Sequence, residues 1–396
     1  MTAKCPICHS NTPIVLEQRA RVPLLQNRVW PDRTSARTAP AGVLDFVLCA
    51  ACGFGWNRLF NRSVVYDQAY NNDQMGSSRF RSHVAEMVER ILMRAPSGHP
   101  IHLVEVGCGQ GALLTGLASR KCFSSLTGFD PAWRGEDGVE IDGITIYRRY
   151  FGPNAIDLLP RGSLFVVSRH TIEHVVDPLS FLRGIRTAMA TTVDGRLFLE
   201  TPDVEHIVEK FQPQDLFYEH CSIFSGESLH VALAAAGFES LLIERVFEGQ
   251  YLWAEARPAV GEVAIAGSCK VADAAEAFTH RLECFILDWR DRTARMAANG
   301  TVYLWGAASK GVTFALLVDP DGIWLSGAID INRDKIGSFM PGSGLPILAP
   351  SVLQNGDCVI VMNPNYFAEI ANQISNMGIS AGLACIDDVK HSELQV

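Results

Sequence analysis

A glycine-rich turn at residues 104–111 has the residue types best suited to bind a ligand. It reads VEVGCGQG and follows the apolar residues IHL, so we expect a buried strand, a tight turn and the start of a helix. Gly107, Gly109 and Gly111 let backbone N–H groups approach a ligand that a Cβ atom would exclude. Asp130 ends the next apolar run, SSLTGFD, where a carboxylate can accept hydrogen bonds from two ribose hydroxyls. The pattern therefore predicts a nucleoside cofactor.

The spacing of the glycines distinguishes among nucleoside cofactors. A dinucleotide site has G-x-G-x-x-G, whereas this turn has G-x-G-x-G with Glu105 before it. A carboxylate at that place would repel a diphosphate, but it suits a cationic amino-acid group. The pattern E-x-G-x-G-x-G resembles motif I of class I S-adenosylmethionine methyltransferases, so we expect that cofactor, with Pro131 and His170 as further contacts. A dinucleotide site and a purely structural turn are the alternatives.

Two Cys-x-x-Cys pairs near the N-terminus have the spacing of metal ligands. They are Cys5 with Cys8 and Cys49 with Cys52. Four thiolates can hold zinc tetrahedrally in a ribbon-like unit, and they leave no open coordination position for catalysis. We therefore expect a structural Zn²⁺. The alternative, four unrelated buried cysteines, does not explain the paired spacing.

The composition excludes several classes of protein. The net charge of −9 and the pI near 5.7 provide no basic face for nucleic acid, which argues against a zinc-ribbon module with an appended RNA methyltransferase. No segment reads as a signal peptide, and no apolar run approaches the ~20 residues of a membrane span. We expect a soluble, cytoplasmic protein without a nucleic-acid or membrane partner. The oligomeric state stays open.

Alternating strand and helix patterns over residues 101–256 predict a doubly wound α/β sheet with helices on both faces. The expected strands are IHLVEVG, SLTGFD, ITIYRR, LFVVSR, RLFLETP, SLLIERVFE and YLWAEARP. A tyrosine-rich segment and a helix precede them, and this segment could fold over the cofactor mouth. The predicted domains are a zinc-binding domain at 1–60, a methyltransferase domain with a Rossmann-like sheet at 61–260, a linker and helix at 261–299, and a smaller Rossmann-like α/β domain at 300–396.

The last of these domains contains a second strand-turn-helix pattern. Its turn, GAASKG, runs from Gly306 to Gly311 and could cradle a phosphate, with Lys310 as a point charge for an anion. Asp330 ends the following strand, where a ribose partner would lie. We expect a nucleotide site here or, equally, a duplicated fold without a ligand.

The order of these three features resembles one family. The four-cysteine unit, the motif I turn and the C-terminal block GAASKG, DINRDKIGSFMPGSGLPI and VIVMNPNYFAEI together are similar to the three-domain C-methyltransferases that act on nucleotide-linked keto-sugars. The resemblance covers nearly the whole chain. It implies a zinc-binding domain, an S-adenosylmethionine-dependent methyltransferase domain and an acceptor that is a nucleotide-linked sugar or a related small molecule.

The family's catalytic positions can be carried over from two motifs. His174 in RHTIEHV matches a family histidine, and Glu219-His220 in FYEHCSIFS matches a Glu-His pair whose histidine is the favoured base. Two family tyrosines are displaced. Asn72 stands at the position of one, with Tyr70 two residues earlier, and Tyr218 lies next to the Glu-His pair.

The chemistry of C-methylation gives each candidate a role. A base must remove a proton next to a ketone, and a histidine with a pKa of about 6.5 suits that task. We expect His220 to be this base, Glu219 to orient it or the substrate, and His174 with one of Tyr70, Tyr218 or Asn72 to stabilise the enolate oxygen. The alternatives are O- or N-methylation, an NAD-linked oxidoreductase and an inactive scaffold.

Overall fold

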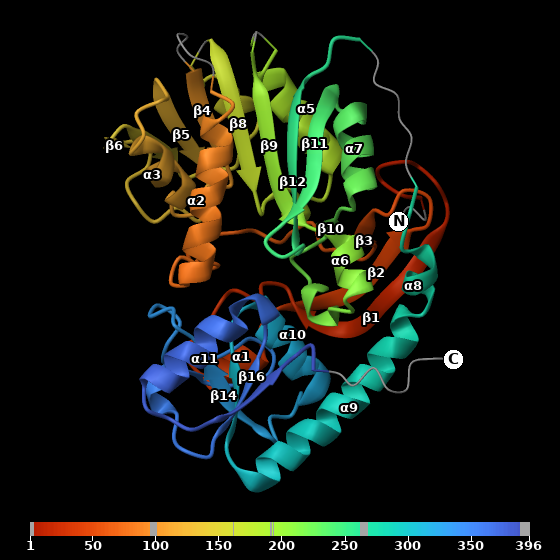
Figure 1. Cartoon of the computed structure of the whole chain (residues 1–396). Coiled ribbons are helices and arrows are strands. Elements are labelled where there is room, and N and C mark those ends of the chain that lie inside the picture. Colours follow the sequence, from red (N-terminus) through yellow and green to blue (C-terminus); the bar gives the residue numbers. More distant parts are fainter. Residues whose placement is uncertain are drawn as a thin grey trace.

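Three β-sheets and the helices that pack on them make up the molecule (Figure 1). The computed structural model describes residues 4–95, 101–160, 162–190, 192, 194–261 and 268–388. Residues 262–267 of the predicted linker and both ends of the chain lie outside the described residues. In the described parts, no helix is long and apolar enough to cross a lipid bilayer.

The first sheet has the strand order β1-β2-β3-β10. Its strands are β1 (Pro13–Pro23), β2 (Ala41–Cys49), β3 (Gly55–Asn57) and β10 (Ser222–Ile223). The apolar run VLDFVLC forms part of β2, whereas the sequence pattern does not predict β1 or β10. Because β10 lies far along the chain and pairs with β3, the N-terminal unit and the central domain share one sheet.

The central sheet has the order β11-β12-β9-β8-β4-β5-β7-β6. Its strands are β4 (Ile101–Val106), β5 (Ser125–Phe129), β6 (Glu140–Ile141), β7 (Ile144–Tyr147), β8 (Ser163–Arg169), β9 (Arg196–Pro202), β11 (Phe238–Val246) and β12 (Tyr251–Pro258). β12 runs antiparallel to both of its neighbours, while β7, β5, β4, β8 and β9 are parallel. Each run predicted for residues 101–258 forms a strand of this sheet, which confirms the predicted α/β fold.

Helices cover both faces of the central sheet because alternate residues of its buried strands point to opposite sides. Leu103 packs in the core under α2 (Ser78–Leu92) and α3 (Ala112–Ala118), whereas Val104 packs in the core under α5 (Pro178–Ala188) and α7 (Gly226–Ala235). The shorter helices are α4 (Pro153–Ile156) and α6 (Val204–Glu209), with 3₁₀ turns η1 (Ile172–His174) and η2 (Pro213–Asp215).

The C-terminal unit is a smaller parallel sheet with the order β15-β14-β13-β16-β17. Its strands are β13 (Val302–Trp305), β14 (Leu325–Ile329), β15 (Ile347–Leu348), β16 (Cys358–Val361) and β17 (Gly382–Cys385). The helices of this part of the chain are α8 (Ala272–Glu276), α9 (Phe278–Asn299), α10 (Ser309–Val318) and α11 (Phe367–Asn376), with 3₁₀ turns η3 (Pro350–Val352) and η4 (Pro364–Tyr366).

The segment between β1 and β2 leaves the first sheet and packs on the C-terminal unit. Its helix α1 (Arg33–Arg37) lies among the elements of that unit in Figure 1. The backbone of Trp30 pairs with Phe339, and the Gly342 N–H donates to the carbonyl of Ala36. This segment, residues 24–40, thereby connects the N-terminal sheet to the far end of the molecule.

Candidate active site

The glycine turn after β4 lies where the sequence predicts it, and each glycine has a different reason to be there. Gly107 has φ +75°, and a Cβ atom at this position would lie 1.9 Å from Thr171 Oγ1. At Gly109 a Cβ would meet no heavy atom within 4 Å, so its bare backbone faces open space. Gly111 begins α3 and does not line the cavity, because its Cα faces Ile146. Its predicted cofactor contact is therefore not supported by the geometry.

A cavity of about 660 Å³ opens over this turn. Gly107, Gly109 and Pro131 lie in its wall together with Asp130, which ends β5. The Asp130 carboxylate accepts hydrogen bonds from the N–H groups of Gly109 and Ala132, each at 2.7 Å. These bonds fix the carboxylate at the cavity edge, and burial raises its pKa. A carboxylate has further lone pairs with which to accept ribose hydroxyls.

Glu105 fits the predicted contact with a cationic group. Its side chain is 3% exposed, it lines the same cavity, and its Oε2 has no hydrogen-bond partner among the described residues. Burial raises its pKa to about 8, although the positive charge of Arg169 acts in the opposite direction. A buried carboxyl with an unused oxygen is an acceptor for a ligand ammonium group, which supports a site for the amino-acid end of the cofactor.

His170 belongs to a buried network of charged side chains beneath the cavity. It has φ +49°, and its Nε2 lies 2.9 Å from Glu200 Oε1. Arg169 and His83 also bond to Glu200, at 3.0 and 2.9 Å. Burial opposes the charge of His170, but the carboxylates of Glu200 and Glu173 raise its pKa to about 9. His170 is therefore a cation at pH 7 and suits an anionic ligand group.

A second cavity, of about 460 Å³, lies between the central domain and the C-terminal unit. Three of the predicted site residues, Asn72, His170 and His174, line both cavities. His220 lines the second. A ligand in the first cavity and a ligand in the second would therefore meet at a shared wall that contains His174.

His220 is buried in the wall of the second cavity. Its ring lies 5.0 Å from that of His174 and 3.8 Å from that of Phe217, centroid to centroid. Its Nδ1 has no hydrogen-bond partner among the described residues. Burial and the nearby His174 and His170 hold the pKa of His220 well below its usual range. The imidazole is therefore neutral at pH 7 and has a free nitrogen.

His174 has fixed partners on one side of its ring. Its Nδ1 lies 2.9 Å from the Tyr66 hydroxyl and 3.0 Å from the Glu219 carbonyl. Burial lowers its pKa, so this imidazole is also neutral at pH 7. Ligand atoms of Glu173, His174 and His220 lie within 4.8 Å of one another, so a buried carboxylate lies close to both rings.

The contacts of Glu219 do not support its predicted role of orienting His220 or the substrate. Its carboxylate accepts hydrogen bonds from the N–H groups of Gln26 at 2.6 Å and Asn27 at 3.2 Å, and it lines neither cavity. The reason is local, because adjacent side chains of the turn point to different sides. Glu219 therefore holds the segment between β1 and β2 against the site. Burial raises its pKa to about 8.

Of the two tyrosine candidates, one lines a cavity and the other does not. Tyr218 lines neither cavity, since its hydroxyl accepts from the Asn61 N–H at 2.8 Å and its ring packs against Phe60 and Gly42. This position does not support the predicted role of Tyr218 at the enolate oxygen. Tyr70 lines the first cavity, and its hydroxyl lies 3.2 Å from Asn27 Nδ2.

The turn of the C-terminal unit lines the second cavity, but Lys310 is not a free charge. Its Nζ lies 2.5 Å from Asp215 Oδ2, so that pair neutralises itself, contrary to the prediction. Gly306 and Gly311 pack closely, because a Cβ on Gly311 would lie 2.0 Å from the Gly306 carbonyl. The buried Lys335 also lines this cavity and has no ion-pair partner among the described residues.

Asp330 repeats the construction of Asp130. Its carboxylate accepts from the N–H groups of Ala307 at 3.0 Å and Asn332 at 2.8 Å. In both units the acid ends the second strand and binds one N–H of the preceding turn and one N–H two residues later. Asp330 faces the second cavity as Asp130 faces the first.

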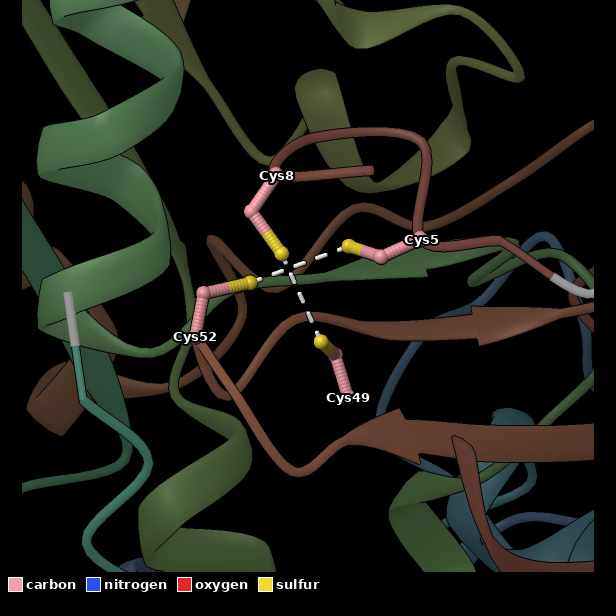
Figure 2. A group of neighbouring side chains, drawn as sticks. All are labelled: Cys5, Cys8, Cys49 and Cys52. Atoms are coloured by element: carbon pink, nitrogen blue, oxygen red, sulfur yellow. Dashed lines mark hydrogen bonds between the residues drawn. The ribbon is translucent and has the colours of Figure 1, made fainter. Parts of the chain in front are cut away.

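The four predicted zinc ligands converge on one point, as Figure 2 shows. Cys5 Sγ lies 3.7 Å from Cys52 Sγ, and Cys8 Sγ lies 3.5 Å from Cys49 Sγ. A tetrahedron with Zn–S bonds of ~2.3 Å has edges of ~3.8 Å, so the thiols fit that ion. The cluster is part of the core that continues under the central sheet.

Comparison with known proteins agrees with this architecture. Residues 79–243 match the family model described as "Methyltransferase domain", and residues 268–385 match "C-methyltransferase C-terminal domain". The chain is also 25% identical over 390 residues to C-methyltransferase NovU of Streptomyces niveus, covering 93% of this chain and 91% of that protein. By these matches the chain is similar to C-methyltransferases over most of its length. It is an S-adenosylmethionine-dependent methyltransferase.

Solved methyltransferase structures resemble parts of this chain. One is N,N-8-amino-8-demethyl-D-riboflavin dimethyltransferase (RosA) from Streptomyces davawensis, with 18% identity over 46% of this chain and 55% of that chain and a TM-score of 0.35. Another is the plantazolicin methyltransferase BpumL in complex with SAH and a monoazolic desmethylPZN analog, with 11% identity over 47% of this chain and 86% of that chain and a TM-score of 0.34.

Three residues that the description of this site depends on line the cavities but are not predicted by the sequence motifs. They are Tyr66, Glu173 and Lys335. Tyr66 belongs to the tyrosine-rich segment that was expected near the cofactor mouth, which is the one signal for it. Glu173 directly precedes His174 in RHTIEHV. Nothing in the local sequence distinguishes Lys335 from the neighbouring charges in DINRDKIG.

Proposed function

We propose that the enzyme transfers a methyl group to a carbon next to a ketone, in a nucleotide-linked sugar or a related small molecule. The observation that carries the proposal is the neutral, buried His220 in the second cavity, beside the wall that both cavities share. Such a base is essential where the acceptor atom must first lose a proton from carbon. A hydroxyl acceptor depends less on such a base.

The first cavity is proposed to hold S-adenosylmethionine. Glu105 would bind the ammonium group, Asp130 the ribose hydroxyls and the Gly107–Gly109 backbone the adjoining atoms, while the cationic His170 suits the carboxylate. When bound, this cosubstrate supplies an electrophilic methyl group on a sulfonium, and the electron pair of the broken C–S bond stays with sulfur.

His220 is proposed to take the proton. The imidazole accepts it from the carbon next to the ketone, and the electron pair of that C–H bond forms an enolate whose carbon bonds to the methyl group. Its lowered pKa keeps the imidazole unprotonated at pH 7. The imidazolium then returns the proton to solvent. The enzyme also contributes by holding both reactants at the shared wall of the two cavities. Such positioning lowers the activation free energy by about 7–11 kcal/mol at best.

The second cavity is proposed to bind the nucleotide of the acceptor. The support is the repeat of the Asp130 construction at Asp330, where ribose hydroxyls would bind. Lys335 offers the positive charge for a phosphate that Lys310 does not, because Asp215 already pairs with Lys310. The four cysteines are proposed to hold a structural Zn²⁺, which the Sγ–Sγ distances support.

Proton exchange tests the proposed function before any methyl transfer. The full-length protein is incubated in D₂O with S-adenosylhomocysteine and a panel of nucleotide-linked 4-keto-sugars. We expect deuterium to enter the carbon next to the ketone of at least one panel member. His220→Ala should abolish this exchange, while His230→Ala, on the outer helix α7, should leave it unchanged. Exchange at the wild-type rate in His220→Ala would contradict the proposal.

A further inference from the structure

We propose that the Tyr66 hydroxyl donates a hydrogen bond to the acceptor oxygen on which negative charge develops, and that His174 positions this hydroxyl. The proposal rests on the proposed function, because that oxygen gains its charge only when the acceptor forms an enolate. Tyr66 lines the first cavity, where the transferred methyl group would lie. No sequence motif points to it, and its contact with His174 is the starting observation.

The Glu219 carbonyl determines which nitrogen of His174 carries the proton. That carbonyl oxygen lies 3.0 Å from His174 Nδ1, and a carbonyl oxygen can only accept a hydrogen bond. If Nδ1 had a lone pair instead of a proton, two electron-rich atoms would face each other at this distance. The geometry therefore assigns the Nδ1–H tautomer to His174.

This tautomer fixes what the Tyr66 hydroxyl can do. Its oxygen lies 2.9 Å from the same Nδ1, so it shares the His174 proton as an acceptor and cannot donate its own proton there. No other acceptor lies within hydrogen-bond distance of the Tyr66 hydroxyl among the described residues. Burial raises the pKa of Tyr66 well above its usual value, so the hydroxyl keeps its proton. The proton is available for a ligand in the cavity.

His174 itself cannot supply that hydrogen bond. The imidazole is neutral because burial lowers its pKa, and with the proton on Nδ1 its Nε2 has a lone pair. A lone pair would repel an enolate oxygen. His174 is therefore a positioning residue that directs Tyr66, and the donor role that the sequence suggests for His174 passes to Tyr66.

Tyr150 also lines this cavity, but its hydroxyl is bonded to the Tyr66 backbone, accepting from the N–H at 2.9 Å and donating to the carbonyl at 3.5 Å. Tyr70 is the remaining tyrosine of this cavity, and its environment differs from that of Tyr66. It lies 3.2 Å from the Asn27 amide, whose Oδ1 has no partner among the described residues. Rotating that amide by 180° would exchange its N and O atoms and place Oδ1 next to Tyr70. Oδ1 could then accept a hydrogen bond from the Tyr70 hydroxyl. Because His174 Nδ1 offers Tyr66 no such acceptor, Tyr66 is the better donor to a ligand. Tyr70 is the matched comparison.

The tautomer can be measured without an acceptor. Long-range ¹⁵N–¹H spectra of the full-length protein with labelled histidine should show His174 protonated on Nδ1 at pH 7.5, with His174→Asn identifying its signals. Tyr66→Phe should leave this tautomer unchanged, because the Glu219 carbonyl still accepts from Nδ1. A His174 that carries its proton on Nε2 would overturn the proposal.

The role of the hydroxyl is measured with paired variants. Tyr66→Phe should bind S-adenosylmethionine within about twofold of wild type in calorimetry, and should lower kcat about 10²–10³-fold, as the loss of one such donor does elsewhere. Tyr70→Phe should lower kcat less than about tenfold. Normal turnover in Tyr66→Phe, or a tenfold loss of its affinity for S-adenosylmethionine, would count against the donor role.

These outcomes differ from a failure of the proposed function. If that function is wrong, wild-type protein will transfer no methyl group to carbon in any nucleotide-linked 4-keto-sugar of the panel. The role assigned to Tyr66 would then be contradicted as well, because there would be no enolate oxygen to accept its hydrogen bond. If only this inference is wrong, wild type will be active and Tyr66→Phe will be as active as wild type.

Discussion

We expect the protonation of Glu105 to respond to cofactor binding. Burial raises its pKa to about 8, so its carboxyl carries a proton at pH 7 in the free protein. A bound ammonium group favours the carboxylate, so S-adenosylmethionine should release this proton on binding. The affinity should then rise between pH 6 and pH 7.5, by up to about tenfold per pH unit. Calorimetry in two buffers of different ionisation enthalpy measures the released proton.

The control for this pH dependence is Glu105→Gln, which has no proton to release. Its affinity for S-adenosylmethionine should be lower and nearly independent of pH over the same range. Wild-type binding without net proton release would show that Glu105 is not the group that meets the ammonium.

Asp130 tests the other end of the proposed cofactor site. Asp130→Ala should weaken S-adenosylmethionine binding about tenfold to a hundredfold, since hydrogen bonds to a charged group contribute about 1.5–3 kcal/mol. The thermal transition should stay cooperative, because the change removes a cavity-edge group and not a core side chain. Asp157→Ala, at the exposed end of α4, is the matched control and should bind normally.

The sequence predicts residue types at this site better than it predicts their contacts. Strand ends and glycine spacing indicate Glu105 and Asp130, because those signals are local. The contact of Tyr66 with His174 and the turning of Glu219 towards Gln26 depend on segments far apart in the chain. Local pattern contains no information about such pairs, so Tyr66 is missed and the contacts of Glu219 are not predicted.

At the scale of elements, the strands of the central sheet follow from apolar runs, because both faces of a parallel sheet are buried. The helix expected within residues 261–299 occurs as α9, and the short helix α8 precedes it. Strands β1 and β10 are not predictable in the same way. Only four of the eleven residues of β1 are buried, and β10 is two residues long and exists through its pairing with β3.

The cysteine cluster packs in a core shared by the first sheet and the central domain. Loss of the cluster should therefore lower the stability of both. Cys49→Ser should lower the zinc content of purified protein and lower the thermal transition, because Cys49 ends β2 inside the shared core. Metal analysis and calorimetry measure the two effects. Cys122→Ser, at an exposed cysteine, is the control. Unchanged zinc in Cys49→Ser would contradict the assignment of the ligands.

At the scale of the whole molecule, the second cavity exists because the C-terminal unit docks on the central domain. Glu369 of α11 accepts hydrogen bonds from the Ser77 hydroxyl at 2.6 Å and the Ser78 N–H at 2.7 Å, at the start of α2. Asn363 and Asn365 reach Gln250 at 3.2 and 3.1 Å. Ser77, Gln250, Asn363 and Glu369 lie in the wall of the second cavity.

Removing the Glu369 carboxylate should loosen this docking. In Glu369→Ala the Ser78 amide should exchange with D₂O about tenfold faster or more, since a hydrogen bond to a charged group contributes about 1.5–3 kcal/mol. Glu283→Ala, on the exposed side of α9, should leave that exchange unchanged. Unaltered Ser78 protection in Glu369→Ala would mean that other contacts hold the two units together.

The central claim is that the two cavities bring a methyl donor and a carbon acid together at His220. Transfer from methyl-labelled S-adenosylmethionine to a panel of nucleotide-linked 4-keto-sugars tests it most directly, with the labelled position read by NMR. The account predicts label on the carbon next to the ketone, and no transfer by a His220→Ala variant that still binds S-adenosylmethionine. Label on oxygen or nitrogen, or normal transfer by His220→Ala, would contradict it.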